Sequence, residues 1–176
     1  MEQLAIAIFG NSYEKILYTI SELTIKYECH ILRAHMTSLG SIYAFTALIT
    51  GNWNTIAKIE AALQNEEANA AGSIIFERTK SKNHQENFLP YSIHVTGIDD
   101  TNIACEIWSF FTAQGIDIDN LSLATGITGA RTPLFDLKIS MNVPADISLA
   151  SLREQFLSLC NELNVDGSIE LKTIAT

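Results

Sequence analysis

The sequence predicts an α+β fold built from two successive modules, each with the element order strand, helix, strand, strand, helix, strand. A strand that ends in Gly10 opens this order, and a strand that ends in Gly97 opens it a second time. The same shift of 87 positions (97 − 10) carries Ile16 onto Ile103, so the apolar pattern repeats although the letters differ. A length of 176 residues suits two modules of roughly 80–85 residues each.

The elements of the first half follow from the spacing of its apolar side chains. Residues 4–9 alternate large and small apolar side chains, which is typical of an interior strand covered on both faces. Asn11 and Ser12 offer an N-cap to a helix, and Gly40-Ser41 is a two-residue hairpin between two β-rich runs. The expected elements are strands at 4–9, 29–39, 42–49 and 73–78, with helices whose apolar stripes are Ile16, Leu17, Ile20, Leu23 and Tyr27, and Ile56, Ile59 and Leu63.

The second half repeats this arrangement from Tyr91. Gly115 is a predicted left-handed C-cap for the first helix, and Ser148 caps the second helix. Expected strands run from Tyr91 to Gly97 and over 116–125, 134–143 and 165–171, with a long loop at 126–133. Each half is therefore a predicted ferredoxin-like sandwich, a four-stranded antiparallel sheet with two helices on one face. We expect a first module at 1–80, a linker at 81–89 and a second module at 90–176.

The composition limits the classes of partner. A net charge of −9 repels phosphate backbones, so direct binding of nucleic acid is not expected. Apolar runs are the length of strands, and the start of the chain is acidic, so we expect a soluble cytoplasmic protein with no membrane segment. The three cysteines are widely spaced and are expected to be reduced thiols rather than disulfides or zinc ligands.

Residues for catalysis do not converge. His30 and His35 point to opposite faces of one strand, and the adjacent Cys29 and His30 also face apart. The glycines form neither of the common phosphate-binding patterns. We therefore expect no enzyme activity, no cofactor and no metal site.

The strand-to-helix turn at 97–103 is the candidate ligand site. Backbone N–H groups at a helix start favour a carboxylate, and an acidic side chain beside them could accept from an ammonium group, so the turn suits an amino acid. The alternative is that Asp99, Asp100 or Thr101 only caps the helix. The residues expected at the site are Gly97, Ile98, Asp99, Asp100, Thr101, Asn102, Ile103, Asp119, Asn120 and, in the first module, Asn11 and Ser12.

Several motifs resemble a known family. The pattern Gly97-x-Asp99-x-x-x-Ile103 followed by residues 115–121 resembles the opening of an ACT domain, a module that senses small molecules. Residues 89–92, 132–135, 143–146 and 163–166, with 50–54 in the first half, resemble the glycine cleavage system transcriptional repressor family over essentially the whole chain. The resemblance implies a tandem ACT regulator that binds a LysR-type activator rather than DNA, and that responds to glycine.

The chain departs from the family pattern at both turns. An ACT turn typically reads Gly-x-Asp-Arg-Pro-Gly-Ile, whereas Asn102 stands here in the place of the last glycine. The first turn, residues 10–16, lacks the aspartate and the Pro-Gly pair, so the first module is degenerate at this point.

The function predicted from the sequence is an amino-acid-responsive repressor of the glycine cleavage operon, with a homodimer as one possible assembly. The ligand is then an amino acid, glycine by resemblance. Two alternatives stay open: an allosteric regulatory subunit of an enzyme of amino-acid metabolism, and a structural interaction protein whose pockets no longer bind.

Overall fold

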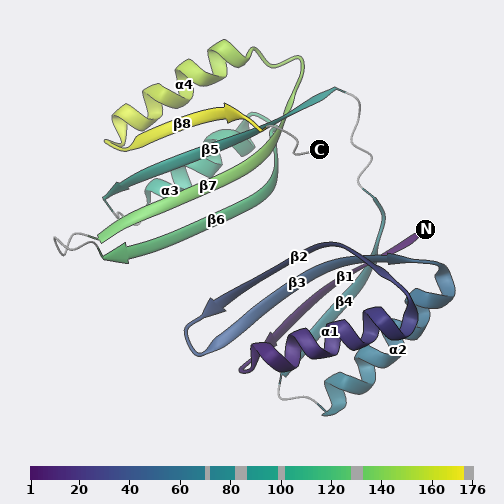
Figure 1. Ribbon diagram of the computed structural model, residues 1–176. Helices are drawn as coiled ribbons and strands as arrows, with labels where there is room; N and C mark the ends of the chain where they lie inside the picture. The colour runs from purple at the N-terminus through teal and green to yellow at the C-terminus, as the bar shows by residue number, and fades with distance from the viewer. Residues whose placement is uncertain (70–71, 82–86, 99–101, 128–132, 173–176) are drawn as a thin grey trace. The chain divides into compact units, whose positions relative to one another are not determined.

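The computed structural model describes residues 1–69, 72–81, 87–98, 102–127 and 133–172 (Figure 1). The chain divides into two compact units, Met1–Asn83 and His84–Thr176, and each is described by itself. Within the described residues, no helix combines the length and the apolar character needed to cross a lipid bilayer.

The first unit is an antiparallel sheet of four strands in the order β2-β3-β1-β4. Two helices cover one face of this sheet (Figure 1). Gly40 has a φ of +65° in the two-residue hairpin between β2 and β3, as the sequence predicts. The elements are β1 (Glu2–Gly10), α1 (Tyr13–Tyr27), β2 (His30–Leu39), β3 (Ile42–Gly51), α2 (Trp53–Asn69) and β4 (Gly72–Thr79).

The second unit repeats this topology with the strand order β6-β7-β5-β8. Its first strand begins at Phe88, within the stretch expected as linker, and the loop expected at 126–133 has its residues 128–132 outside the described part of the chain. The elements are β5 (Phe88–Ile98), α3 (Ile103–Ala113), β6 (Asp117–Ile127), β7 (Pro133–Pro144), α4 (Leu149–Glu162) and β8 (Asp166–Leu171). The two predicted ferredoxin-like modules are thus both present.

Each unit has its own core between the sheet and its two helices. The central strands β1 and β5 supply alternate side chains to it, Leu4, Ile6 and Ile8 in one and Tyr91, Ile93 and Val95 in the other. Each core also holds one buried cysteine, Cys29 or Cys160, whereas Cys105 is exposed. Burial raises the pKa of the Cys160 thiol to about 11, so this thiol is protonated at neutral pH.

Three helices end in the same way, with one residue in the left-handed conformation. After α3, Gly115 has a φ of +71°, and the N–H of Ile116 donates to the carbonyl of Phe111. After α1, Glu28 has a φ of 52° and Cys29 donates to Thr24. After α4, the left-handed residue is Asn164, with a φ of 55°. This termination satisfies carbonyls of the last turn and brings the next residue back to the core, and the left-handed conformation predicted at Gly115 is confirmed.

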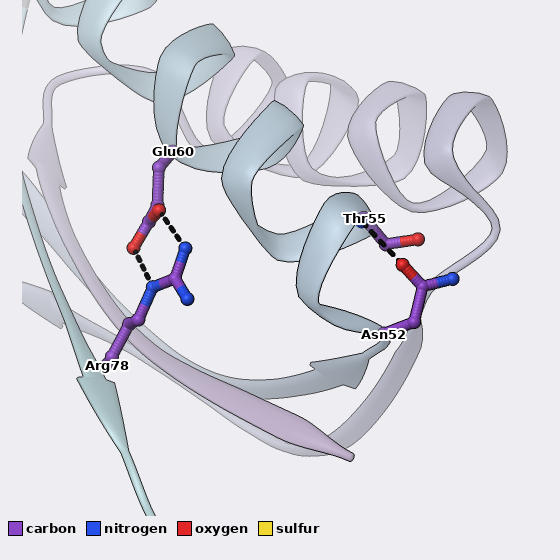
Figure 2. Close-up of polar contacts among 4 residues, drawn as sticks. All are labelled: Asn52, Thr55, Glu60 and Arg78. Carbon is purple, nitrogen blue, oxygen red and sulfur yellow. Dashed lines mark hydrogen bonds and ion pairs between the residues drawn. The ribbon is translucent and has the colours of Figure 1, made fainter.

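The helix α2 is fixed at two points by polar contacts (Figure 2). At its start, the Asn52 Oδ1 accepts from the backbone N–H of Thr55 at 2.8 Å. Further along, Glu60 accepts two hydrogen bonds from the Arg78 guanidinium of β4, at 2.8 and 2.7 Å. This bidentate ion pair lowers the pKa of Glu60, and the Arg78 guanidinium also lies 5.5 Å from the centre of the Trp53 ring.

Replacing Glu28 with glycine should stabilise the first unit. A left-handed φ strains any residue with a Cβ, and a carboxylate is unfavourable at a helix C-terminus. We expect Glu28→Gly to raise the free energy of unfolding by about 0.5–1 kcal/mol in urea denaturation. Glu28→Gln removes the charge and keeps the strain, so its gain should be smaller. A loss of stability in the glycine variant would contradict the strain argument.

The Glu60–Arg78 pair should make stability depend on pH in a defined direction. Because the folded state lowers the pKa of Glu60 below its ordinary 4.5, its contribution is present above that pH and is lost as the pH falls through the folded-state value. The difference in free energy of unfolding between the native chain and Glu60→Gln should therefore be largest at neutral pH and shrink in acid. Glu154→Gln, at an exposed position on α4, is the control. A difference that is the same at every pH would exclude this role.

Candidate functional site

A cleft of about 570 Å³ lies at the strand-to-helix turn of the first unit. Its floor is formed by the end of β1 and by the start of β4, and one side of α1 forms its wall. Its volume lies within the range of about 300–1,000 Å³ that small-molecule sites have. The lining residues are Ile8, Phe9, Gly10, Asn11, Ser12, Glu14, Lys15, Ile16, Tyr18, Thr19, Glu22, Gly72 and Ile74.

The start of α1 supplies the polar groups at one end of this cleft. Ser12 is the N-cap: its hydroxyl oxygen accepts from the backbone N–H of Lys15 at 3.3 Å, and the hydroxyl donates to Glu14 at 2.9 Å. The pKa of Glu14 is lowered, first by a hydrogen bond from its own backbone N–H and then by that from Ser12. The carboxylate of Glu14 therefore already interacts with the positive end of the helix dipole. A ligand carboxylate that bound at the helix start would have to displace it.

The remaining side of the cleft adds a second acidic group. Glu22 accepts a hydrogen bond from the Tyr18 hydroxyl, which raises the pKa of Tyr18. Among the residues that line the cleft, Glu14 and Glu22 are acidic and Lys15 is basic, while the floor is apolar. This arrangement favours a small ligand that carries an ammonium group, with Lys15 available for an anionic group on the same molecule.

The turn of the second unit is described only at its two ends. Gly97 and Ile98 are the last residues of β5, and Ile103 is the buried first residue of α3. Asp99, Asp100 and Thr101 lie outside the described residues. Asn102 is the N-cap of α3, with φ −103° and ψ −21°, and its side chain makes no capping hydrogen bond.

Gly97 has a packing role that the sequence did not reveal. A Cβ on this residue would lie 2.7 Å from Val165 Cγ1 and 3.1 Å from Phe135 Cε1. Real Cβ atoms do not approach other atoms at 2.7 Å, so the strand reaches this position only because the residue is glycine. The close approach is to the protein's own core side chains rather than to an open turn.

The second unit does not bring Asp119 and Asn120 beside the turn at Gly97. Asn120 pairs with Ser140, which pairs with Ser92, whereas Gly97 lies five residues further along β5. At about 3.4 Å per residue this separation is about 17 Å along the strand. A ligand in contact with both places would need a second module to bring them together.

Asp119 also departs from the regular alternation of its strand. The β6 register shifts between Ile118 and Asn120, so Asp119 is the extra residue of a β-bulge. In the described part of the chain, no three His, Cys, Asp or Glu side chains gather into a group able to hold a metal ion.

Of the expected site residues, Asn11 and Ser12 line the cleft. The sequence pattern did not point to Glu14, Lys15 and Glu22, because its motifs favoured the other turn.

Residues 2–76 match the family model described as an ACT domain. The match covers the first module. This module therefore fits the ACT model although its turn departs from the usual ACT motif. The chain is also similar to two proteins named glycine cleavage system transcriptional repressor, from Escherichia coli (strain K12) and Shigella flexneri. Each is 26% identical over 169 residues, which cover 96% of this chain and 89% of the relative.

Two solved structures resemble the whole chain. A crystal structure of a candidate glycine cleavage system transcriptional repressor matches with a TM-score of 0.70 at 23% identity and covers 98% of both chains. An unknown protein from Galdieria sulphuraria matches with a TM-score of 0.73 at 18% identity, over 98% of this chain and 99% of its own. These likenesses establish the fold as a tandem of two ACT-like modules.

Replacing Gly97 with alanine should destabilise the second unit. The added methyl group must displace Val165 or Phe135 in a packed region, which costs about 1–3 kcal/mol. We expect a lower melting temperature and a lower free energy of unfolding in urea. Gly126→Ala in β6 is the matched control, because a Cβ there meets no atom within 4 Å. Equal effects of the two substitutions would contradict the packing role.

Proposed function

We propose that this chain is a regulatory protein of the tandem ACT type that represses the glycine cleavage operon in response to an amino acid. The observation that carries the proposal is the extent of the similarity to the named repressors, which spans both modules and 96% of the chain. A protein that shared only a sensing module with these repressors would match over one half.

We propose that the amino acid binds in the cleft of the first unit. Its ammonium group would pair with Glu22, and its carboxylate would pair with Lys15. Glycine, the signal that the family resemblance suggests, is the smallest amino acid and would leave room for water in a cleft of about 570 Å³. A larger amino acid could fill more of the apolar floor, so the panel of test ligands has to extend beyond glycine.

The turn at Gly97 is proposed as the second ligand position. Asp99 would accept from the ammonium group, and the residues around Ile98 and Asn102 would border the ligand. Asp119 and Asn120 would reach the ligand only from another module, since their own strand places them level with Ser92. The first unit is the favoured position because the described cleft lies at its turn, although Lys15 there and Asn102 in the second unit both stand where the ACT pattern has glycine.

The partner that we propose is a LysR-type activator rather than DNA. A chain with 20 acidic and 11 basic residues lacks the charge that phosphate contacts require. Repression would follow from holding the activator in an inactive complex. The amino acid would release it by binding one arrangement of the protein better than the other, which shifts the population of the form that holds the activator.

Capture of the activator with and without glycine tests this proposal. Immobilised protein should retain the purified LysR-type activator in buffer and release it when millimolar glycine is added. Glu22→Gln removes a proposed ammonium contact, so this variant should retain the activator in the presence of glycine. Glu154→Gln, outside the cleft, should behave like the native chain.

Thermal unfolding separates loss of ligand binding from loss of folding. A ligand that binds the native state must raise the melting temperature by mass action. We expect glycine or another amino acid to raise the melting temperature of the native chain and to have less effect on Glu22→Gln. An effect lost only in Asp99→Asn would place the ligand at the second turn. If no amino acid of the panel changes the capture of the activator, the proposal that this protein senses an amino acid is wrong.

A further inference from the structure

The two sheets differ in the face that lies opposite their helices, which we call the open face. Strand pairing places alternate residues on this face, and the central row of the first unit is His35, Thr46, Ala7 and Ile75. The row at the same position in the second unit is His94 with Lys138 and Ser168. The row of the first unit thus includes two apolar side chains, Ala7 and Ile75, whereas the row of the second unit has none.

The neighbouring rows show the same contrast. The first unit has Leu48, Ala5 and Glu77 across one row, and the equivalent row of the second unit is Ser140, Ser92 and Glu170. The next row is Thr37, Ala44, Phe9 and Ser73 in the first unit and Ala124, Asp136, Thr96 and Asp166 in the second. Leu39 and Ile42 extend the apolar face of the first unit at the hairpin end.

The polar side chains of the second open face can be solvated, whereas the exposed apolar side chains of the first are unfavourable in water. In the second unit, Asp136 accepts from Lys138 at 3.0 Å and lies 2.7 Å from His94 Nε2, and all three side chains are partly exposed. In the first unit, Ile75 is 63% exposed and Phe9 is 39% exposed. The fold does not require exposed apolar side chains in the central rows, because the second unit forms the same sheet with a largely polar open face whose exposed apolar pair, Ile98 and Leu134, lies at the end of the strands. Exposed large apolar side chains gathered on one face mark an interaction surface.

We propose that a second copy of this chain covers the open face of the first unit, with a two-fold axis parallel to the strands. Such an axis lays β2 of one copy over β4 of the other, and β3 over β1. Two sheets pack in this aligned way about 10 Å apart, with interdigitating side chains. A two-fold contact uses the same patch on both copies, so the patch has to be complementary to itself.

The side-chain sizes across the face have this self-complementarity. Rotation about the axis places Leu48 of one copy over Ala5 of the other, and Phe9 over Ala44. Leu48 and Phe9 thus each meet an alanine, and Ile75 lies over His35 of the other copy. Alternation of large and small side chains lets two packed faces interdigitate. Each pair occurs twice in the dimer because of the symmetry.

The charges on the face are also complementary under the same rotation. Arg33 lies at the β2 edge and Glu77 at the β4 edge of a single row, joined through Leu48 and Ala5. Within one copy these edges are about 14 Å apart, since strands are spaced by about 4.8 Å, too far for a direct ion pair. Across the axis, Arg33 of each copy lies over Glu77 of the other. A partner with a different sequence would not be expected to match this row at both ends.

The area is sufficient for a dimer. Four strands and about eight residue steps give a face of about 500 Å² per copy, from a strand spacing of about 4.8 Å and a rise of about 3.4 Å. Two copies bury about 1,000 Å², which is the lower bound for a specific interface. An interface at this lower bound is of the size found in weak or transient association.

Exchange of the two charges tests the proposal by sedimentation equilibrium without any amino acid present. Arg33→Glu alone and Glu77→Arg alone each place like charges over one another at two points, so each variant should be monomeric at a concentration where the native chain is dimeric. An equimolar mixture of the two variants restores both opposite-charge contacts and should form a heterodimer. Restoration on mixing is expected only if the two residues meet between copies.

A second variant tests the apolar contacts. Ala7→His, Phe9→Thr, Leu48→Ser and Ile75→Ser together install the side chains of the second open face and should weaken association by at least about tenfold. Ile25→Ser on α1, which is 79% exposed, is the control and should leave the dimer intact. A native chain that stays monomeric at high micromolar concentration would overturn the proposal, whether the face is then covered by its own second module or by the activator. A dimer that survives both sets of substitutions would overturn it equally.

Discussion

The burial of every second side chain of the two central strands is the constraint on which the structure depends. β1 and β5 each pair with two neighbours, so their residues are fixed to one face or the other with no freedom of register. The side chains that point to one face, among them Ile6 and Ile93, require two helices over them. The helices in turn must end where the chain can return to the sheet, and the left-handed residues after α1, α3 and α4 make that return possible.

The elements were predictable because their periods are visible in the sequence. Apolar side chains recur at every second residue in β1 and at helical spacing in α1, and the glycines at 40 and 115 adopt the left-handed conformations expected of them. Glu28 could not be predicted in that conformation, because its side chain disfavours it and only the packing of Cys29 imposes it. The bulge at Asp119 could not be predicted either, because a single extra residue in a strand does not show in the alternation of apolar and polar side chains.

The candidate site was harder to predict than the fold, because a cleft is a property of surfaces brought together. Sequence motifs directed attention to the turn at Gly97, whereas the described cleft lies at the turn of the first module. The glycine at 97 lies where Val165 approaches the strand, so a residue type that matched a ligand motif has a packing explanation. The reading of residues 4–9 as a strand covered on both faces came from Ala5, Ala7 and Phe9, whose face carries no helix. The prediction of cover on both faces is therefore wrong for the module by itself, in which Phe9 is 39% exposed.

Each module contains one buried cysteine whose reaction with a thiol reagent would measure the opening of that module. Cys29 is enclosed in the core of the first unit and Cys160 in that of the second, while Cys105 is open to solvent on α3. A thiol reagent applied to the folded protein would modify Cys105 alone, and modification of either other cysteine would record the opening of the unit that holds it. Because the two cores share no residue, mass spectrometry of the separated peptides would follow the two openings independently in one sample. The repeat thereby makes it possible to ask which half of the molecule opens first.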